Sequence, residues 1–158
     1  MNAFISYSIN EDEQYILTLL SQKVAEAGLT LVTSYNQSDW PDPQTANEIK
    51  NSVLFIGLMT GSGSLGKRSR VYSEFKQANL FSRPAILLIE DTVEVGLWED
   101  FYHNTIRFNR FYIKQAVEEV KRRISTSQTD QPNQNAAGWI LGGIAVLALL
   151  SLLSSDKK

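Results

Sequence analysis

The 158-residue sequence contains no cysteine and only one histidine, His103. Without thiols the chain cannot form disulfides, use a thiolate nucleophile or bind zinc through cysteine. A single histidine cannot build a His-rich metal site, so we expect no metal. Lysine and arginine are scattered and the formal net charge is −2, which makes nucleic acid a poor candidate partner.

Charge is also absent from one long segment, residues 136–153, which reads AAGWILGGIAVLALLSLL. A helix of about 20 residues spans a hydrocarbon core of roughly 30 Å. We therefore expect a transmembrane helix over residues 136–155, with Trp139 near the membrane interface. A buried core helix is the alternative, but a core helix in a small domain usually has a polar face, and this segment has none.

The composition divides the remainder of the chain into three parts. Residues 1–124 have the size of one ordinary domain, residues 125–135 form a polar flexible linker, and residues 156–158 form a short charged tail. The start of the sequence has no signal-peptide pattern, so we expect a cytoplasmic domain on a single-pass C-terminal anchor. Gly138 and Gly142 have the G-x-x-x-G spacing of paired membrane helices, although glycine is also common in unpaired ones.

Apolar runs alternate with helical patterns along the domain. We expect strands at residues 3–7, 29–33, 53–59, 85–89 and 105–108, and helices at residues 11–27, 44–51, 69–80 and 113–124. The third and fourth runs are apolar throughout, which is typical of strands buried on both faces. The pattern predicts an α/β domain with a flavodoxin-like parallel sheet of about five strands flanked by helices. In such sheets ligands bind at the carboxyl ends of the strands.

A glycine-rich loop, residues 60–68, follows the third predicted strand. Gly61 to Lys67 matches the G-x-x-x-x-G-K of a phosphate-binding P-loop, but Arg68 follows where a serine or threonine would bind magnesium. A nucleoside-triphosphatase is therefore a weak alternative.

Four segments carry a more specific signal because they occur in a fixed order. They are AFISYS at residues 3–8 followed by Asp12, EIKNS at 48–52, SRVYSEF at 69–75 and RPAILLI at 83–89. Their succession resembles that of TIR (Toll/interleukin-1 receptor) domains, and the resemblance covers residues 1–124. Two features depart from the family pattern: Arg70 stands where a tryptophan is usual, and the second conserved box is replaced by residues 38–42. The second departure favours a bacterial type over a receptor adaptor.

The resemblance implies a substrate and a set of site residues. Glu74 falls on the glutamate that is catalytic in NAD-cleaving TIR domains, and Ser6, Tyr7, Ser8 and Trp40 would contact NAD as substrate, with no bound cofactor. Cleavage of the nicotinamide–ribose bond passes through an oxocarbenium-like state, which one carboxylate can stabilise. The alternative for Glu74 is a solvated helix carboxylate among Lys67, Arg68, Arg70 and Lys76.

The function that the resemblance implies is a membrane-anchored TIR NAD+ glycohydrolase or cyclase in bacterial anti-phage immune signalling. Self-association would run through the TIR domain and through the Gly138/Gly142 motif of the anchor. The alternative is a non-catalytic TIR module that recruits other TIR proteins at the membrane.

We predict that the full chain stays in the membrane pellet after an alkaline carbonate wash, because residues 136–153 carry no charge. Deletion of residues 136–158 should move the protein to the soluble fraction. Release of the full-length protein by the wash would contradict the predicted anchor.

Overall fold

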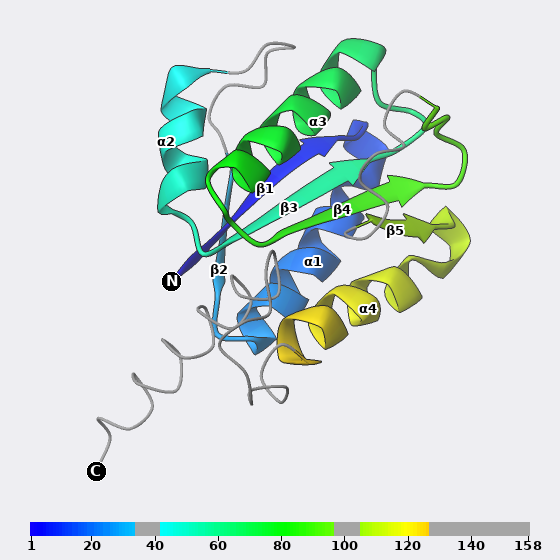
Figure 1. Ribbon diagram of the computed structural model, residues 1–158. Coiled ribbons are helices and arrows are strands. Elements are labelled where there is room, and N and C mark those ends of the chain that lie inside the picture. The colour runs from blue at the N-terminus through cyan, green and yellow to red at the C-terminus, as the bar shows by residue number, and fades with distance from the viewer. Residues whose placement is uncertain (34–41, 97–104, 127–158) are drawn as a thin grey trace.

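The computed structural model describes residues 1–33, 42–96 and 105–126 (Figure 1). These ranges contain five strands and four helices, which alternate as far as β4, and a 3₁₀ turn precedes the first and the last helix. The strands are β1 (Asn2–Ser8), β2 (Thr30–Thr33), β3 (Leu54–Met59), β4 (Ala85–Glu90) and β5 (Thr105–Phe108). The helical elements are η1 (Glu11–Glu13), α1 (Gln14–Glu26), α2 (Pro43–Asn51), α3 (Leu65–Leu80), η3 (Arg110–Tyr112) and α4 (Ile113–Thr126).

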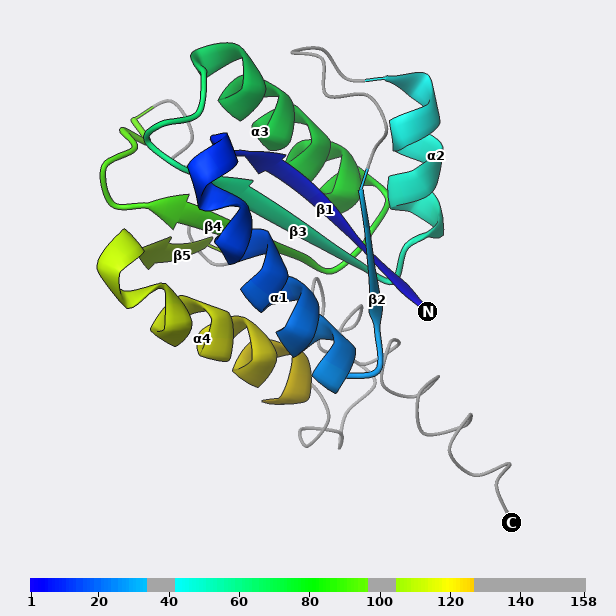
Figure 2. The same ribbon diagram turned by 180° about the vertical axis from the view of Figure 1, so that it is seen from behind.

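The strands form one parallel sheet in the order β2-β1-β3-β4-β5. Helices α2 and α3 cover one face, and α1 and α4 cover the other (Figures 1 and 2). The predicted α/β architecture with a five-stranded parallel sheet is therefore confirmed. Ser8 pairs with Met59 at the last register position of β1 and β3, so both strands end at the same edge.

Side chains of β1, β3 and β4 alternate between two hydrophobic cores, one on each side of the sheet. Phe4 of β1 stacks on Phe55 of β3, with ring centroids 5.9 Å apart, in the core beneath α2 and α3. Ile5, the next residue, packs in the core beneath α1 and α4. The inner strands β3 and β4 are buried along their whole length, which explains their continuous apolar runs.

Helix α3 begins at Leu65, four residues before the predicted start. The Ser64 hydroxyl caps the helix by accepting a hydrogen bond of 3.2 Å from the Lys67 N–H, so the loop after β3 is short. At the other end of the domain, α4 continues to Thr126 and includes the first two residues of the predicted linker. Gly28 ends α1 with φ = 79°, a left-handed conformation that favours glycine.

No helix within residues 1–33, 42–96 and 105–126 is long and apolar enough to cross a membrane. The predicted anchor at 136–155 with Gly138 and Gly142, the tail at 156–158 and most of the linker lie outside the described residues, as do Trp40 and His103.

We predict that Gly63→Ala destabilises the domain by about 1–3 kcal/mol, the usual cost of overpacking. A Cβ at residue 63 would overlap the Ser8 hydroxyl and lie 2.7 Å from the Ser8 carbonyl oxygen, which belongs to the backbone of β1. Gly96→Ala is the matched control, because a Cβ there meets nothing within 4 Å. Urea unfolding of the two variants measures the difference, and equal stabilities would contradict the close packing.

Candidate functional site

Glu74 lies in the middle of α3 on the side that faces the sheet. Only 2% of the residue is exposed, whereas its neighbour Lys76 is exposed. The alternative of a solvated helix carboxylate is therefore wrong. Ionised side chains are rarely buried this deeply unless they are paired or functional, so the surroundings of Glu74 identify the candidate site.

Arg70 is the cation that accompanies Glu74 one helical turn earlier. Its Nε lies 3.9 Å from Glu74 Oε1, and its Nη2 donates a hydrogen bond of 2.9 Å to the Tyr7 carbonyl oxygen of β1. Arg70 is 4% exposed, so the alternative that placed it among solvated charges beside Glu74 is wrong for this residue as well. The four-residue spacing from Glu74 was the available signal, because residues i and i+4 share one side of a helix.

The ionisation of Glu74 is controlled by burial and three neighbouring groups. Burial raises the pKa of the Glu74 carboxyl, the Ser6 hydroxyl and the Arg70 guanidinium lower it, and the Glu48 carboxylate raises it again. The net pKa lies above the ordinary glutamate value. The buried Ser6 hydroxyl is a hydrogen-bonding neighbour of the Glu74 carboxyl, which is how it lowers the pKa of that group.

Ser6, Tyr7 and Ser8 were predicted to contact NAD. Because side chains alternate along β1, these three do not all lie on the same face of the sheet. Ser6 and Ser8 lie on the side of α3, where Ser6 acts on Glu74 and Ser8 packs against Gly63. The Tyr7 side chain packs with the core beneath α1 and α4. The structure therefore brings Ser6 and Ser8 to the face of Glu74, and Tyr7 reaches that face only through its carbonyl oxygen.

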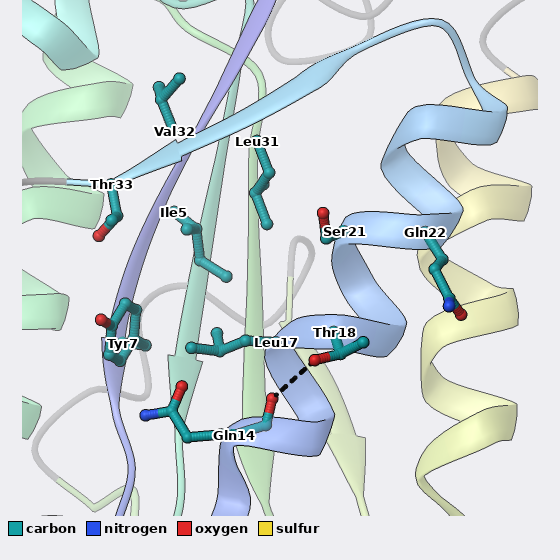
Figure 3. Close-up of a pocket in the computed structure, with 10 residues that line it drawn as sticks. All are labelled: Ile5, Tyr7, Gln14, Leu17, Thr18, Ser21, Gln22, Leu31, Val32 and Thr33. Atoms are coloured by element: carbon teal, nitrogen blue, oxygen red, sulfur yellow. Dashed lines mark hydrogen bonds between the residues drawn. The ribbon is translucent and has the colours of Figure 1, made fainter. Parts of the chain in front are cut away.

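The Tyr7 side chain lines a separate groove between α1 and the first two strands (Figure 3). The groove has a volume of about 400 Å³, and none of its lining side chains is charged. They are Ile5, Tyr7, Gln14, Leu17, Thr18, Ser21, Gln22, Leu31, Val32 and Thr33. The sheet lies between this groove and Glu74, so the groove lacks the carboxylate that N-glycoside cleavage requires.

A second polar cluster, which sequence reasoning missed, lies at the carboxyl edge of the sheet. Arg110 donates two hydrogen bonds to the Glu90 carboxylate, 2.5 Å from Nε and 3.0 Å from Nη2, and a third of 3.2 Å to Glu13. The hydroxyls of Thr60 and Ser62 donate to Glu13 over 2.7 and 2.5 Å. Ion pairs thereby join Glu13, Glu90 and Arg110, which are distant in the sequence, and hydrogen bonds attach the loop after β3 to Glu13.

The glycine-rich loop is part of this second cluster. The Gly61 N–H donates a hydrogen bond of 2.6 Å to Glu90, so an internal carboxylate binds a backbone group that a P-loop would offer to phosphate. Burial alone would raise the pKa of Glu90, but the hydrogen bonds from Arg110 and Gly61 outweigh it and hold the pKa low. No group of three or more potential metal ligands occurs within the part of the chain that the structure describes.

Comparison with known proteins identifies the fold. No protein-family model matches the sequence, and no curated protein matches it. Among solved structures, the fold is similar to that of a CMP N-glycosidase from Clostridium botulinum, with a TM-score of 0.53 and 16% sequence identity. The match covers 77% of this chain and 99% of that one. A distant structural neighbour is thus a nucleotide glycosidase, and at this identity the likeness shows the fold alone.

We predict that Glu74→Gln raises the melting temperature at pH 7.5. The raised pKa means that ionised Glu74 is less stable in the folded protein than in water, and glutamine removes this cost. The advantage should shrink as the pH falls through the raised pKa and vanish below the ordinary value of 4.5, where Glu74 is protonated in both states. Thermal melts from pH 4 to 8 test this, and a variant that melts lower at pH 7.5 would contradict it.

Proposed function

We propose that this protein cleaves the N-glycosidic bond between nicotinamide and ribose in NAD+, with Glu74 as the catalytic carboxylate. The observation that carries the proposal is the burial of the Glu74 carboxyl beside the Ser6 hydroxyl and the Arg70 guanidinium, with a pKa above the ordinary glutamate value. A buried carboxylate next to a hydroxyl is suited to bind a ribose, since ribose hydroxyls can donate to one and accept from the other.

The bond cleavage needs only stabilisation of positive charge. As the C1′–N bond breaks, its electron pair moves to the pyridinium nitrogen, and nicotinamide leaves as a neutral molecule. The carboxylate of Glu74 stabilises the positive charge that remains on the ribose. Water then adds to C1′ and loses a proton, so the products are ADP-ribose, nicotinamide and one proton. Attack by a nitrogen of the adenine instead of water would give a cyclic product.

Arg70 has a positioning role in this proposal. Its guanidinium is held by the Tyr7 carbonyl oxygen and lies 3.9 Å from Glu74 Oε1. At that distance the guanidinium acts on the carboxylate through its charge and not through a hydrogen bond. The raised pKa of Glu74 agrees with this weak pairing, because burial outweighs the effect of Arg70.

A nucleotide with a neutral base is the second candidate substrate. It is favoured by the fold that the chain shares with a CMP N-glycosidase. Departure of a neutral base usually requires a proton donor, because the base would otherwise leave as an anion. The raised pKa of Glu74 would help it to hold such a proton at mildly acidic pH, so the two substrates predict different pH dependence.

The wider setting that we propose follows from the resemblance of residues 1–124 to TIR domains. In this setting the protein is a TIR-type enzyme on a membrane anchor, self-associates, and acts in bacterial defence against phage. The exposed aromatic rings of Tyr15, Phe111 and Tyr112 provide apolar surface on the described domain that such self-association can use. A non-catalytic module that recruits other TIR proteins remains the alternative, and the experiment below separates the two.

We predict that Glu74→Gln lowers the rate of NAD+ cleavage by about a thousandfold or more, because the loss of a carboxylate aimed at the transition state costs several kcal/mol. The matched control is Glu118→Gln, which removes an exposed carboxylate on α4, on the other face of the sheet. Release of nicotinamide from NAD+ and of cytosine from CMP, each followed chromatographically at high protein concentration, measures cleavage of the two substrates.

Three results have distinct meanings in this assay. Wild-type turnover in the Glu74→Gln variant would show that the glutamate is a bystander. Cleavage of CMP and not of NAD+ would select the second candidate substrate. A folded wild-type protein that cleaves neither compound would favour the recruitment module.

A further inference from the structure

We propose that the amino edge of the sheet docks on an anionic membrane surface and thereby turns the carboxyl edge away from the bilayer. The amino edge is the side of the domain on which the strands begin and the helices end (Figure 1). This inference rests on the membrane anchor of the proposed function, since it names the lipid surface and the orientation of an anchored domain.

The described chain leaves the domain at this edge. Two ion pairs join α1 and α4 in the same order along both helices, so the helices run side by side in one direction (Figure 2). They are Lys23 with Glu118 over 2.8 Å and Glu26 with Lys121 over 2.6 Å. Glu26 ends α1 at the amino edge, and the last residues of α4, up to Thr126, follow Lys121 there. The chain therefore continues from the amino edge toward the predicted anchor.

The distance from this edge to the predicted anchor is limited. Residues 127–135 separate α4 from the uncharged segment 136–153. A chain extends by at most about 3.5 Å per residue, so residues 127–135 reach no further than about 30 Å. A tether of that length holds the domain at a high local concentration above the bilayer, and a weak attraction then suffices to dock it.

The amino edge carries a surplus of positive charge. The last six residues of the four helices, together with the described loops that lead from them to the next strand, contain seven basic side chains and two acidic ones. The basic residues are Lys23, Lys50, Lys76, Arg83, Lys121, Arg122 and Arg123, and the acidic residues are Glu26 and Glu48. The carboxyl edge has no such surplus, because exposed carboxylates accompany its basic residues. They belong to Glu11, Asp12, Asp91 and Glu94. An anionic surface therefore attracts the amino edge.

Three of these seven cations are not neutralised within the described domain. The other four pair with carboxylates of α1 or α4. Lys50, Lys76 and Arg83 form no ion pair with any described residue, and the buried Nε of Arg83 has no hydrogen-bond partner there. Lys76 Nζ lies 5.3 Å from the centroid of the Tyr72 ring, a contact that leaves its charge in place. Lys50 and Lys76 are exposed and Arg83 is half-buried, so their charges are available to phosphate headgroups.

Leu80 adds an apolar side chain to the same place. It is the last residue of α3 and is 82% exposed, with Lys76 one helical turn before it and Arg83 three residues after it. At a membrane surface, apolar side chains enter the boundary between headgroups and acyl chains while neighbouring cations attract anionic lipid. The end of α3 combines both kinds of group on the edge from which the chain leaves, which favours a lipid surface over an acidic protein as the partner.

Docking in this orientation leaves the carboxyl edge accessible. Helix α3 runs from the carboxyl edge at Leu65 to the amino edge at Leu80, a length of roughly 22 Å. Ligands of parallel sheets bind at the carboxyl edge. The membrane therefore covers the opposite end of the domain, and an anionic substrate such as NAD+ approaches the end that lies away from the lipid charges.

The test uses the purified full chain in vesicles of phosphatidylcholine, either alone or with phosphatidylserine at about one lipid in four. The sequence has no cysteine, so Leu80→Cys provides a single site for an environment-sensitive fluorophore. Leu65→Cys is the matched control, because Leu65 is 67% exposed at the other end of the same helix. With phosphatidylserine present, we expect a lipid-borne quencher to reach the label at residue 80 and an aqueous quencher to lose access to it. The label at residue 65 should stay in water.

Charge should control the docking. Lys50→Gln combined with Lys76→Gln removes two exposed cations, and we expect the ratio of docked to undocked protein to fall about fivefold for each lysine. Lys50→Arg with Lys76→Arg should retain the docking, and Lys114→Gln, at the exposed start of α4 on the carboxyl edge, should leave it unchanged. Salt at about 1 M shortens the Debye length to about 3 Å and should undock the domain while the chain stays in the membrane.

Flotation of the vesicles on a density gradient separates failure of the docking from failure of the anchor. A chain that floats with both kinds of vesicle but keeps the label at residue 80 in water overturns the docking and retains the anchor. A chain that floats only with the anionic vesicles refutes the anchor and supports the docking, and one that floats with neither refutes both. Protection of the label in neutral vesicles as well would mean that a second copy covers this edge, which also overturns the docking.

Discussion

The ion pair of Arg110 with Glu90 and Glu13 is the interaction on which the geometry of the site depends. Glu90 ends β4 and Glu13 follows β1, and both carboxylates are buried where the strands end. They in turn bind the loop between β3 and α3 through the Gly61 amide and the Ser62 hydroxyl. The start of α3 is therefore fixed relative to the sheet, and with it the depth at which Glu74 meets β1. Partners of opposite charge make such burial tolerable, although a buried ion pair seldom adds much stability by itself.

Glu74 occupies the opposite situation. Its carboxyl is buried with a guanidinium at 3.9 Å instead of in direct contact, and its pKa is raised, whereas the pKa of Glu90 is lowered. Two glutamates in one small domain thus differ: hydrogen bonds from Arg110 and Gly61 stabilise Glu90 as an ion, whereas the neighbours of Glu74 do not offset the cost of burying its charge. The second kind is the more informative about function, because an enzyme retains a destabilising charge where a substrate or transition state will use it.

The fold could be predicted from the sequence because the apolar runs of β3 and β4 and the spacing of apolar residues in α1 and α4 are local signals. Glu74 was singled out by the resemblance of the residues around it to a TIR segment, whereas its burial became apparent only in the fold. The burial of Arg70 could not be predicted, because Lys67 and Arg68 precede it and such a basic run is usually exposed to solvent. Only the packing of α3 on the sheet buries this residue. The role of Arg110 was not predictable, because its partner Glu13 is 97 positions away and only the closed sheet brings them together. Tyr7 was predicted with Ser6 and Ser8 at the end of the first strand, and strand alternation turns its side chain to the other face of the sheet.

The same long separation has a consequence for how the domain is made. Glu13 and Glu90 leave the ribosome before Arg110 does, since synthesis runs from the N-terminus. A nascent chain that lacks η3 would have to bury two carboxylates without their cation, which is strongly unfavourable. The sheet therefore has little reason to close early, and parallel strands, whose contacts are non-local, fold slowly in any case. The domain can therefore close only after Arg110, shortly before the last helix, has been synthesised. The site around Glu74 forms only when nearly all of the domain has left the ribosome.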